Sequence, residues 1–555
     1  MIRKQNIMMN TKMIKQKAAM ARLRLVWTST LAVFFSAFVL QAQDSLDVQK
    51  LGQLSYSQTI NDVWGWVDTA NSKEYALVGV QNGLSVVDVT NPSNPVQTNF
   101  FAGASSTWRD MKTFGNYAYT VHDVFNGTSD GIFIVDMTTI GNQFPTFFRR
   151  TPTLTVGSTT GTLTRAHNLY IDENGFMYLF GANIGNGGAL IFDLNTTPTN
   201  PTFVGAFDDF YLHDGVVRGD TMWGAAVING FFMPIDVSVK SAPSISATQT
   251  TPFNFTHNIW FSDDNQRVFT TDEKSGAFIA EYDVSDLGNI SETDRIRSSF
   301  GNDVIPHNVH FHNNFLVNSY YTAGLQILDV SQPGFMIETG YYDTSPANGD
   351  GFSGCWGAYP YLPSGNILAT DRQTGLFVLG SDYSRGCYLN ATVVDSITRQ
   401  NIIIANVEVL NTDMIGTTNI FGNFRSGQAQ AGTFQAVVSK AGYFTDTFSI
   451  TMSNGVMLNK QFALLSLTVS SKEQALLNSV SIYPNPTRSK VKLSGLAEFG
   501  GDLQWSLLDL SGKVLEQGQL DVQNAEIDFG SNYKGYYLLQ LANKSANKTY
   551  SLTFE

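Results

Sequence analysis

A polar pair followed by a short apolar segment recurs along the first two thirds of this chain, and this recurrence limits the folds the chain can adopt. The pair is found in "RAHNLYIDENG", "YLHDGVVRGD", "FTHNIWFSDD" and "IPHNVHFHNN". Aligned on it, the chain contains seven units, which open at Trp64-Gly65, Arg109-Asp110, His167-Asn168, His213-Asp214, His257-Asn258, His307-Asn308 and Trp356-Gly357. Successive units begin about 44 to 58 residues apart.

Each unit also carries several strand patterns. Segments such as "GLSVVDVTNPSNP", "GIFIVDMTTIGNQFP" and "LQILDVSQPG" combine a β-branched apolar run, an Asp and a turn, and another strand pattern such as "EYALVGV" or "YAYTVHD" precedes each. The expected order is strand, strand, strand, turn, strand. Four-stranded units at a period of roughly 40–50 residues are typical of β-propeller blades. The repeat therefore predicts a seven-bladed β-propeller over residues 45–383, in which the recurring Asp caps a turn.

The seventh unit, "CWGAYPYLPSGNILATDRQTGLFVLG", lacks a fourth strand pattern. The segment "DVQKLGQLSYSQ", which precedes the first unit, resembles the outer strands of other units and has no inner strand of its own. We predict that it closes the ring as the outer strand of blade seven, because closure protects sheet edges that would otherwise pair with other chains.

The remaining parts of the chain have sequence patterns that differ from those of the repeats. Residues 387–466 show short alternating strands with turn residues between them, which predicts a small β-sandwich. A second β-sandwich is expected at 475–555, so the predicted fold class is all-β throughout. Residues 1–42 combine basic residues, an apolar run and the small Ala42, which is typical of a signal peptide. A retained anchor helix is the alternative; otherwise no transmembrane segment is expected in the mature protein.

The charge and the cysteine content limit which cellular compartments and which kinds of partner are expected. The net charge is −13, and the chain has no concentrated basic surface pattern, which argues against nucleic acid as a partner. The two cysteines, Cys355 and Cys387, are expected to pair in an oxidising compartment. Two unpaired buried thiols are the alternative.

Several segments resemble known families. The "GLSVVDV", "GIFIVDM" and "LQILDV" strands resemble LVIVD repeats, and the layout of signal and propeller resembles the choice-of-anchor B family. The "NVEV", "GNF" and "SKAGYF" elements of 387–466 resemble carboxypeptidase-regulatory-like modules of prealbumin type. The "YPNP", "DLSGKV" and "KGYYLLQL" elements of 475–555 resemble a type IX secretion C-terminal sorting domain, type A. This last resemblance implies the type IX secretion machinery as a partner and a secreted or outer-membrane surface location in a Gram-negative bacterium.

The repeats also predict a candidate site. In a propeller, the starts of the inner strands form a ring at one end of the channel, and the loops between second and third strands reach the same end. The residues expected there as ligand-binding groups are Arg109, Asp110, His122, His167, His213, Asp214, His257, Asp272, Glu273, His307, Asp371 and Arg372. No catalytic residue is assigned. Neutral imidazoles beside carboxylates suit a divalent metal, with His167, His213, His257 and His307 as candidate ligands, whereas protonated imidazoles beside the two arginines would favour an acidic ligand.

Three functions remain open at this point. The chain contains no "GxSxG", "HExxH", "GxxxxGK[ST]" or EF-hand motif, which favours a non-enzymatic propeller that binds a ligand or protein at its central pocket. One alternative is an extracellular hydrolase or lyase that uses the His/Asp ring with a divalent metal, and another is a structural adhesin component. The repeated pairs also have a structural interpretation, in which Asn or Asp caps a turn and His bonds to a neighbouring blade.

Overall fold

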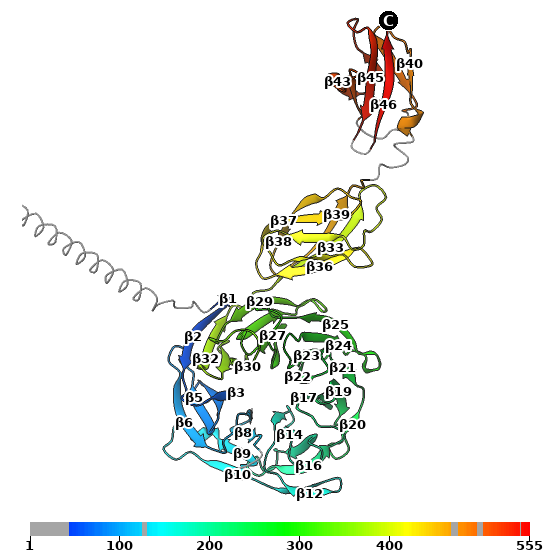
Figure 1. Ribbon diagram of the computed structural model, residues 1–555. Helices are drawn as coiled ribbons and strands as arrows, with labels where there is room; N and C mark the ends of the chain where they lie inside the picture. The colour runs from blue at the N-terminus through cyan, green and yellow to red at the C-terminus, as the bar shows by residue number, and fades with distance from the viewer. Residues whose placement is uncertain (1–43, 125–129, 468–475, 497–502, 544–545) are drawn as a thin grey trace, which may run out of the picture.

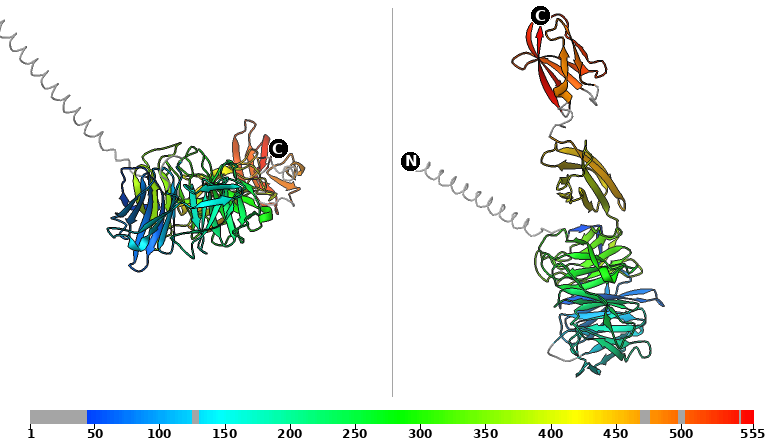
Figure 2. Two further views of the ribbon diagram at one scale, coloured as in Figure 1. Left: turned by 90° about the horizontal axis from the view of Figure 1, so that it is seen from below. Right: turned by 90° about the vertical axis from the view of Figure 1, so that its right-hand side faces the viewer.

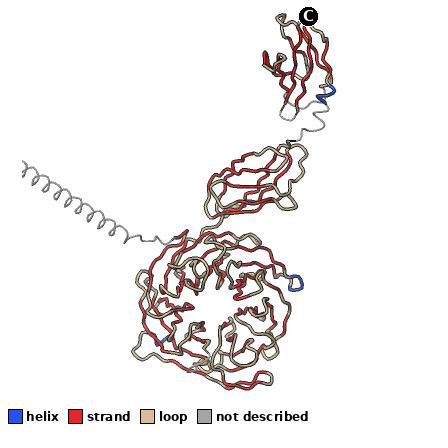
Figure 3. Tube along the Cα trace, in the orientation of Figure 1, coloured by secondary structure: helices blue, strands red, loops and turns tan. Residues whose placement is uncertain are grey.

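The computed structural model describes residues 44–124, 130–467, 476–496, 503–543 and 546–555, and the predicted signal peptide at 1–42 lies outside these residues. The described chain is all-β, as predicted. Antiparallel sheets between residues 45 and 381 follow one another around a central axis, which is the arrangement of a β-propeller (Figures 1 and 3). Figure 2 shows the same ring of sheets from two further directions.

The described residues of the ring form seven sheets of four or five strands, which we number as blades in chain order. Blade one contains β3 (Ile60–Asp68), β4 (Lys73–Val80), β5 (Gly83–Asp88) and β6 (Val96–Ala102). Blade two contains β7 (Arg109–Phe114), β8 (Tyr117–His122), β9 (Ile132–Asp136) and β10 (Phe147–Arg150). Blade three contains β13 (Asn168–Ile171), β14 (Phe176–Phe180), β15 (Ala189–Asp193) and β16 (Thr202–Phe207). Between blades two and three, the longest interval of the repeat is occupied by a hairpin of β11 (Thr153–Val156) and β12 (Thr159–Thr162).

The other four blades follow the same order. Blade four contains β17 (Asp214–Arg218), β18 (Thr221–Ala226), β19 (Phe231–Asp236), β20 (Ser244–Ile245) and β21 (Gln249–Thr250). Blade five contains β22 (Thr256–Phe261), β23 (Arg267–Asp272), β24 (Ile279–Asp283) and β25 (Ser291–Ile296). Blade six contains β26 (Val309–His312), β27 (Phe315–Ser319), β28 (Leu325–Asp329) and β29 (Ile337–Tyr342). Blade seven contains β30 (Cys355–Tyr359), β31 (Ile367–Asp371), β32 (Gly375–Ser381) and, from the N-terminal segment, β2 (Val48–Leu54).

Pairing of β2 with β32 confirms the predicted closure. The two strands are antiparallel, with Val48 opposite Ser381 and Leu54 opposite Leu376. The short strand β1 (Ser45–Leu46) pairs with β29 on the outer edge of blade six. The N-terminal segment therefore covers the outer edges of two neighbouring blades.

The recurring Asp at the end of each third strand has the structural role that the sequence predicts. In blades one to six, its Oδ1 accepts a hydrogen bond from the backbone N–H two residues further on, at 2.8–3.0 Å. The six residues are Asp88, Asp136, Asp193, Asp236, Asp283 and Asp329. This Asx turn ends the strand and starts the connection to the outer strand. Two of these connections include short 3₁₀ turns, η1 (Met137–Thr139) and η2 (Leu287–Asn289).

Apolar side chains fill the space between neighbouring blades. Between blades three and four, for example, Tyr178 and Phe180 pack in one buried cluster with Val217, Met222 and Ile235. Each is at most 1 % exposed, so the propeller core is distributed around the ring rather than gathered in one centre.

Two further β-sandwiches follow the ring in the chain. The first pairs a sheet of β33 (Cys387–Asp395), β36 (Asn423–Gln428) and β39 (Met457–Leu464) with one of β34 (Asn406–Val409), β35 (Ile415–Thr417), β37 (Gly432–Ser439) and β38 (Asp446–Met452). The second pairs β40 (Ser481–Tyr483), β41 (Lys490–Ser494) and β44 (Glu526–Asp528) with β42 (Leu503–Leu508), β43 (Val514–Leu520), β45 (Gly535–Ala542) and β46 (Asn547–Phe554). Each has a hydrophobic cluster of its own. No helix among the described residues has the length and apolarity needed to span a membrane.

The predicted disulfide between Cys355 and Cys387 is wrong in this structure. Both thiols are free and buried. Cys355 packs in the apolar cluster between blades six and seven, whereas Cys387 packs in the core of the first sandwich. Because each side chain is a small apolar group in a separate core, the two sulfur atoms do not meet.

Candidate functional site

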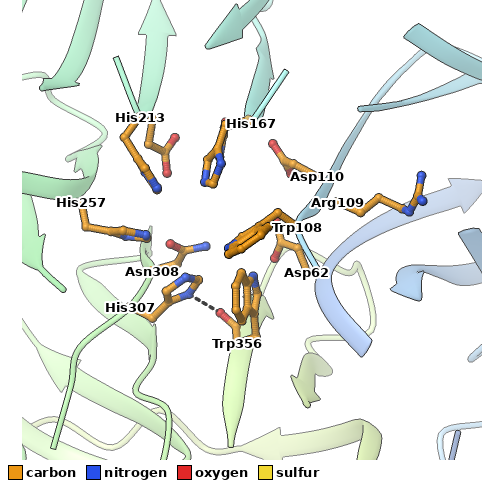
Figure 4. A pocket seen from close by; sticks show the side chains of 12 residues that line it. Asp62, Trp108, Arg109, Asp110, His167, His213, His257, His307, Asn308 and Trp356 are labelled. Carbon is orange, nitrogen blue, oxygen red and sulfur yellow. Dashed lines mark hydrogen bonds between the residues drawn. The ribbon is translucent and has the colours of Figure 1, made fainter. Parts of the chain in front are cut away.

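Four imidazoles lie side by side at one end of the channel, which we call the mouth (Figure 4). They belong to His167, His213, His257 and His307, which occupy the starts of the inner strands of blades three to six. Successive ring centroids are 4.0, 4.3 and 4.6 Å apart, and the Trp356 ring of blade seven lies 4.7 Å beyond His307. We call the four imidazoles the histidine arc. These four residues occupy equivalent positions in the aligned repeats, and the structure brings them together from four blades.

The second residue of each pair has a different role, because it ties neighbouring blades together. Asp110 accepts a hydrogen bond from the Leu169 backbone N–H at 2.7 Å, across blades two and three. Between blades four and five, the Asn258 side-chain amide donates to Asp214 at 2.6 Å. The Asn258 Oδ1 then accepts from the Val309 backbone N–H of blade six at 2.9 Å. The second residues of the pairs therefore have a structural role, but as bonds between blades and not as the turn caps that were expected. His167 and His307 do make the expected bonds to neighbouring blades, to Asp123 and to the Trp356 carbonyl.

In some blades, a local irregularity of the backbone gives the side chains of the two paired residues different directions. The register between inner and second strands shifts between Thr256 and Asn258 in blade five, and between Cys355 and Gly357 in blade seven. Such a β-bulge re-aims one side chain relative to the regular alternation. His257 and Trp356 occupy these bulges, so their rings turn to the channel while the flanking residues stay in the ladder.

Replacement of Asn258 by Ala is expected to lower the free energy of unfolding by about 1–3 kcal/mol. The reason is that Asp214 and the Val309 N–H would both lose a partner while remaining buried. The matched control is Asn308→Ala in the next blade, because the Asn308 Oδ1 is buried without a hydrogen-bond partner among the described residues. Urea unfolding of both variants measures the difference, and equal losses would contradict this assignment.

Hydrogen bonds fix the tautomers of two histidines in the arc. His307 Nδ1 lies 2.5 Å from the Trp356 carbonyl oxygen, which can only accept, so Nδ1 carries the proton and Nε2 keeps a lone pair. His167 Nδ1 lies 3.0 Å from a carboxylate oxygen of Asp123, which also forms an ion pair with Arg165. In His213 and His257, the buried Nδ1 has no hydrogen-bond partner among the described residues.

Two histidines of the arc, His213 and His307, are neutral near pH 7. Burial, together with the neighbouring imidazoles, lowers the pKa of His213 and of His307 well below the usual range. Neutral imidazole offers a lone pair to a metal ion or to a hydrogen-bond donor. These two residues therefore do not provide the positive charge that an acidic ligand would require.

Glu273 is a carboxylate that approaches two histidines of the arc. It lies in the loop after β23, with one oxygen 3.7 Å from His257 Nε2 and the other 3.8 Å from His307 Nε2. The buried Tyr321 hydroxyl donates a hydrogen bond to Glu273. Burial, and then the charge of Glu273, raises the pKa of Tyr321 well above its usual range, so this hydroxyl keeps its proton.

Four predicted site residues turn away from the channel or serve loops. The Arg109 guanidinium donates to the Ala104 carbonyl at 2.6 Å, although the residue lines the mouth. Burial lowers the pKa of His122 to about 4, and its Nε2 accepts a hydrogen bond from the Asp130 backbone. Asp272 and Asp371 accept bonds from the residues that shape their loops, which are Thr251, Phe253 and Phe255 for the first, and Thr344, Gln373 and Thr374 for the second. For His122, Asp272 and Asp371, the sequence located the strand ends correctly but not the directions of the side chains.

Other groups at the mouth include two aromatic residues and a cation. Trp108 lines the pocket and is 45 % exposed. Arg372, which was predicted, lies over the Trp356 ring at 5.0 Å and donates to the Phe352 carbonyl. The sequence analysis did not select Trp108. Its position directly before the pair Arg109-Asp110 could have indicated that it lies at the site.

The space inside the mouth is small. The cavity lined by the histidine arc has a volume of about 30 Å³, which is room for about one or two water-sized groups. Further along the channel, Trp260 lies 4.7 Å from the His310 ring and 6.2 Å from that of Tyr361. Burial lowers the pKa of His310 to about 3, so this histidine is a neutral part of an aromatic layer. A ligand can therefore place only an ion or a small group inside the arc.

The fold and the repeats define the class of protein. Residues 68–100 and 319–344 match the LVIVD repeat, so the chain is a β-propeller protein with LVIVD repeats. Residues 481–554 match the secretion system C-terminal sorting domain. No curated protein sequence matches the chain. The protein is thus an exported propeller of a Gram-negative bacterium, secreted or held at the cell surface, and its sorting domain interacts with the type IX secretion machinery.

Proposed function

We propose that this protein binds an extracellular ligand at the mouth of its propeller, through the histidine arc. The observation that carries the proposal is the division of roles within the repeated pairs. Asp110, Asp214 and Asn258 hold the blades together, whereas the arc adds four neighbouring rings, tilted relative to one another, whose polar edges are only partly used. Buried polar atoms without partners are costly, and they are retained where a ligand can complete them.

The chemistry of the mouth favours a ligand that donates hydrogen bonds. His213 and His307 are neutral, and His307 keeps the Nε2 lone pair as an acceptor. Glu273 and Asp123 add carboxylate acceptors at the same rim. Trp108 offers an exposed aromatic face beside them, on which the apolar face of a sugar ring or an ammonium group can stack. A hydroxyl-rich saccharide end therefore fits better than an acidic molecule.

The double variant His213→Ala/His257→Ala is expected to abolish saccharide binding and to change the melting temperature little. The physical reason is that the two rings pack against each other at the cavity, and the side-chain hydrogen bond between Asp214 and Asn258 that joins blades four and five is retained in the variant. Binding is measured on an array of neutral and uronic-acid oligosaccharides, followed by calorimetry on the strongest hit. A variant that melts far below the wild type and still binds would contradict the proposal.

A matched control is His312→Ala, because His312 is a histidine at the other end of the β26 strand, beside Tyr361 and Tyr383. It should bind as the wild type does. The alternative functions give different results in the same assay. A hydrolase or lyase would shorten the array oligosaccharides, which chromatography detects, and a purely structural adhesin component would bind none of them in either form.

A further inference from the structure

We propose that His257, Glu273 and His307 form a binding site for a single transition-metal ion, with Zn²⁺ as the best match. This inference rests on the proposed function in one respect, because the ion would lie at the same mouth and present its open position to the ligand. The sequence placed a metal among four histidines. The structure instead assembles two histidines and a carboxylate from blades five and six.

The donor atoms have suitable spacing. Candidate ligand atoms of the three residues all lie within 4.8 Å of one another. A tetrahedral ion with bonds of about 2.1 Å separates its ligands by about 3.4 Å. Glu273 approaches the two histidines with different oxygens, at 3.7 Å to His257 Nε2 and 3.8 Å to His307 Nε2, so a side-chain rotation would be needed to bring one oxygen to that spacing from both nitrogens.

The surroundings hold two of these donors in place. His307 donates its Nδ1 proton to the Trp356 carbonyl, which leaves Nε2 directed to Glu273. Metal-binding histidines commonly have such a partner on the other ring nitrogen, and ligand carboxylates are commonly hydrogen-bonded as well. Tyr321 fulfils this second condition by donating to Glu273.

A separate observation concerns His257, which is 4 % exposed. Its Nδ1 has no hydrogen-bond partner among the described residues, and its ring faces the cavity (Figure 4). The nitrogen that faces Glu273 is Nε2, at 3.7 Å, so an ion at this site would use Nε2 and leave Nδ1 for a separate hydrogen bond. The cavity of about 30 Å³ has room for an ion and one further small group.

The donor set also selects the metal. Two imidazoles and one carboxylate favour Zn²⁺ and its transition-metal neighbours over Mg²⁺ and Ca²⁺, which prefer oxygen ligands. With three protein ligands, a fourth position remains for His213, whose ring lies 4.3 Å from that of His257, or for a group of the ligand. His167 lies at the far end of the arc and is engaged with Asp123, so it is not part of the site.

The test is a titration of the purified, chelator-treated full chain with Co²⁺ and Zn²⁺, without any saccharide. We expect about one equivalent of Co²⁺ with the visible absorption of a tetrahedral site, displaced by Zn²⁺, and no binding of Mg²⁺ or Ca²⁺. Glu273→Gln keeps an oxygen for the Tyr321 proton and should weaken Zn²⁺ binding at least about tenfold. His307→Gln should remove it, whereas the controls His167→Ala and His312→Ala should bind as the wild type does.

Circular dichroism is used to check that each variant is folded. If His307→Gln is unstable, the test relies on Glu273→Gln, which is the most conservative change. Failure of the wild type to bind Co²⁺ or Zn²⁺, or binding by Glu273→Gln that equals the wild type, would overturn the metal site. Saccharide binding that persists in excess chelator would leave the proposed function standing without it. Metal binding in a protein that binds no saccharide would support the metal site and reject the ligand.

Discussion

A chain that begins at Thr59, and so lacks β1 and β2, is expected to lose at least about 5 kcal/mol of folding free energy and most of its solubility. β2 forms six residue pairs with β32. A backbone hydrogen bond contributes about 1 kcal/mol to stability relative to the same groups bonded to water. Deletion would also uncover the apolar contacts of Val48, which is 5 % exposed. The exposed β32 edge would then be free to pair with other chains. Since domains are stable by only about 5–15 kcal/mol, a loss of this size is close to unfolding.

The control for this deletion is a chain that begins at Asp47. It lacks only β1, which contributes two residue pairs to the edge of blade six. This shorter deletion should lower stability by about 1–2 kcal/mol and leave the protein soluble. Thermal melting and the soluble fraction after expression measure both effects. If the chain from Thr59 melts at the temperature of the intact protein, closure by β2 has no energetic importance.

Removal of residues 475–555 is expected to reduce the exported fraction at least about tenfold and to leave a folded protein in the periplasm. The sorting domain lies at 481–554 and carries the address for type IX secretion. Its strands enclose their own cluster, which includes Val491, Leu507, Leu539 and Leu552. Because this core contains no propeller side chain, its loss should not unfold the ring.

Cell fractionation and immunoblotting in a Gram-negative host with type IX secretion measure the outcome. The matched control deletes residues 387–466 instead, a segment of similar length with its own core. This variant retains the sorting domain and should still leave the cell. Export of the chain that ends at residue 474, at the level of the intact protein, would contradict the assignment.

Much of the fold follows from local patterns in the sequence. The strand, Asp and turn of each repeat predict the Asx turns at Asp88, Asp136 and the equivalent residues, because a side chain that bonds two residues away needs no distant partner. The missing fourth strand of the last unit and the unpaired strand pattern at residues 48–54 also predict the closure of the ring. Ring closure is non-local, but it was deducible because the repeat shows which strand is absent.

The site was predictable only in part. Alignment of the units placed His167, His213, His257 and His307 at one end of the channel, where the structure has them in contact. The alignment also placed Arg109 there, and it lines the mouth, although its guanidinium bonds to the Ala104 carbonyl. His122, Asp272 and Asp371 were expected there from the loops between second and third strands, but their side chains hold those loops instead. Strand position follows from the repeat, whereas side-chain direction depends on bulges such as those at His257 and Trp356.

By itself, the sequence determined the all-β class, the repeat, the order of strands, the export signal at the C-terminus and the column of histidines. Each of these depends on residues close together in the chain or on a regular period. The sequence placed Glu273 at the same end of the channel as the histidines, but only the tertiary structure decided that it lies against His257 and His307 and accepts a hydrogen bond from Tyr321. Tertiary structure also decided that Cys355 and Cys387 stay apart in separate cores. The reason is physical: such contacts depend on how loops from different blades turn and on which core each side chain enters, and neither leaves a pattern in the local sequence.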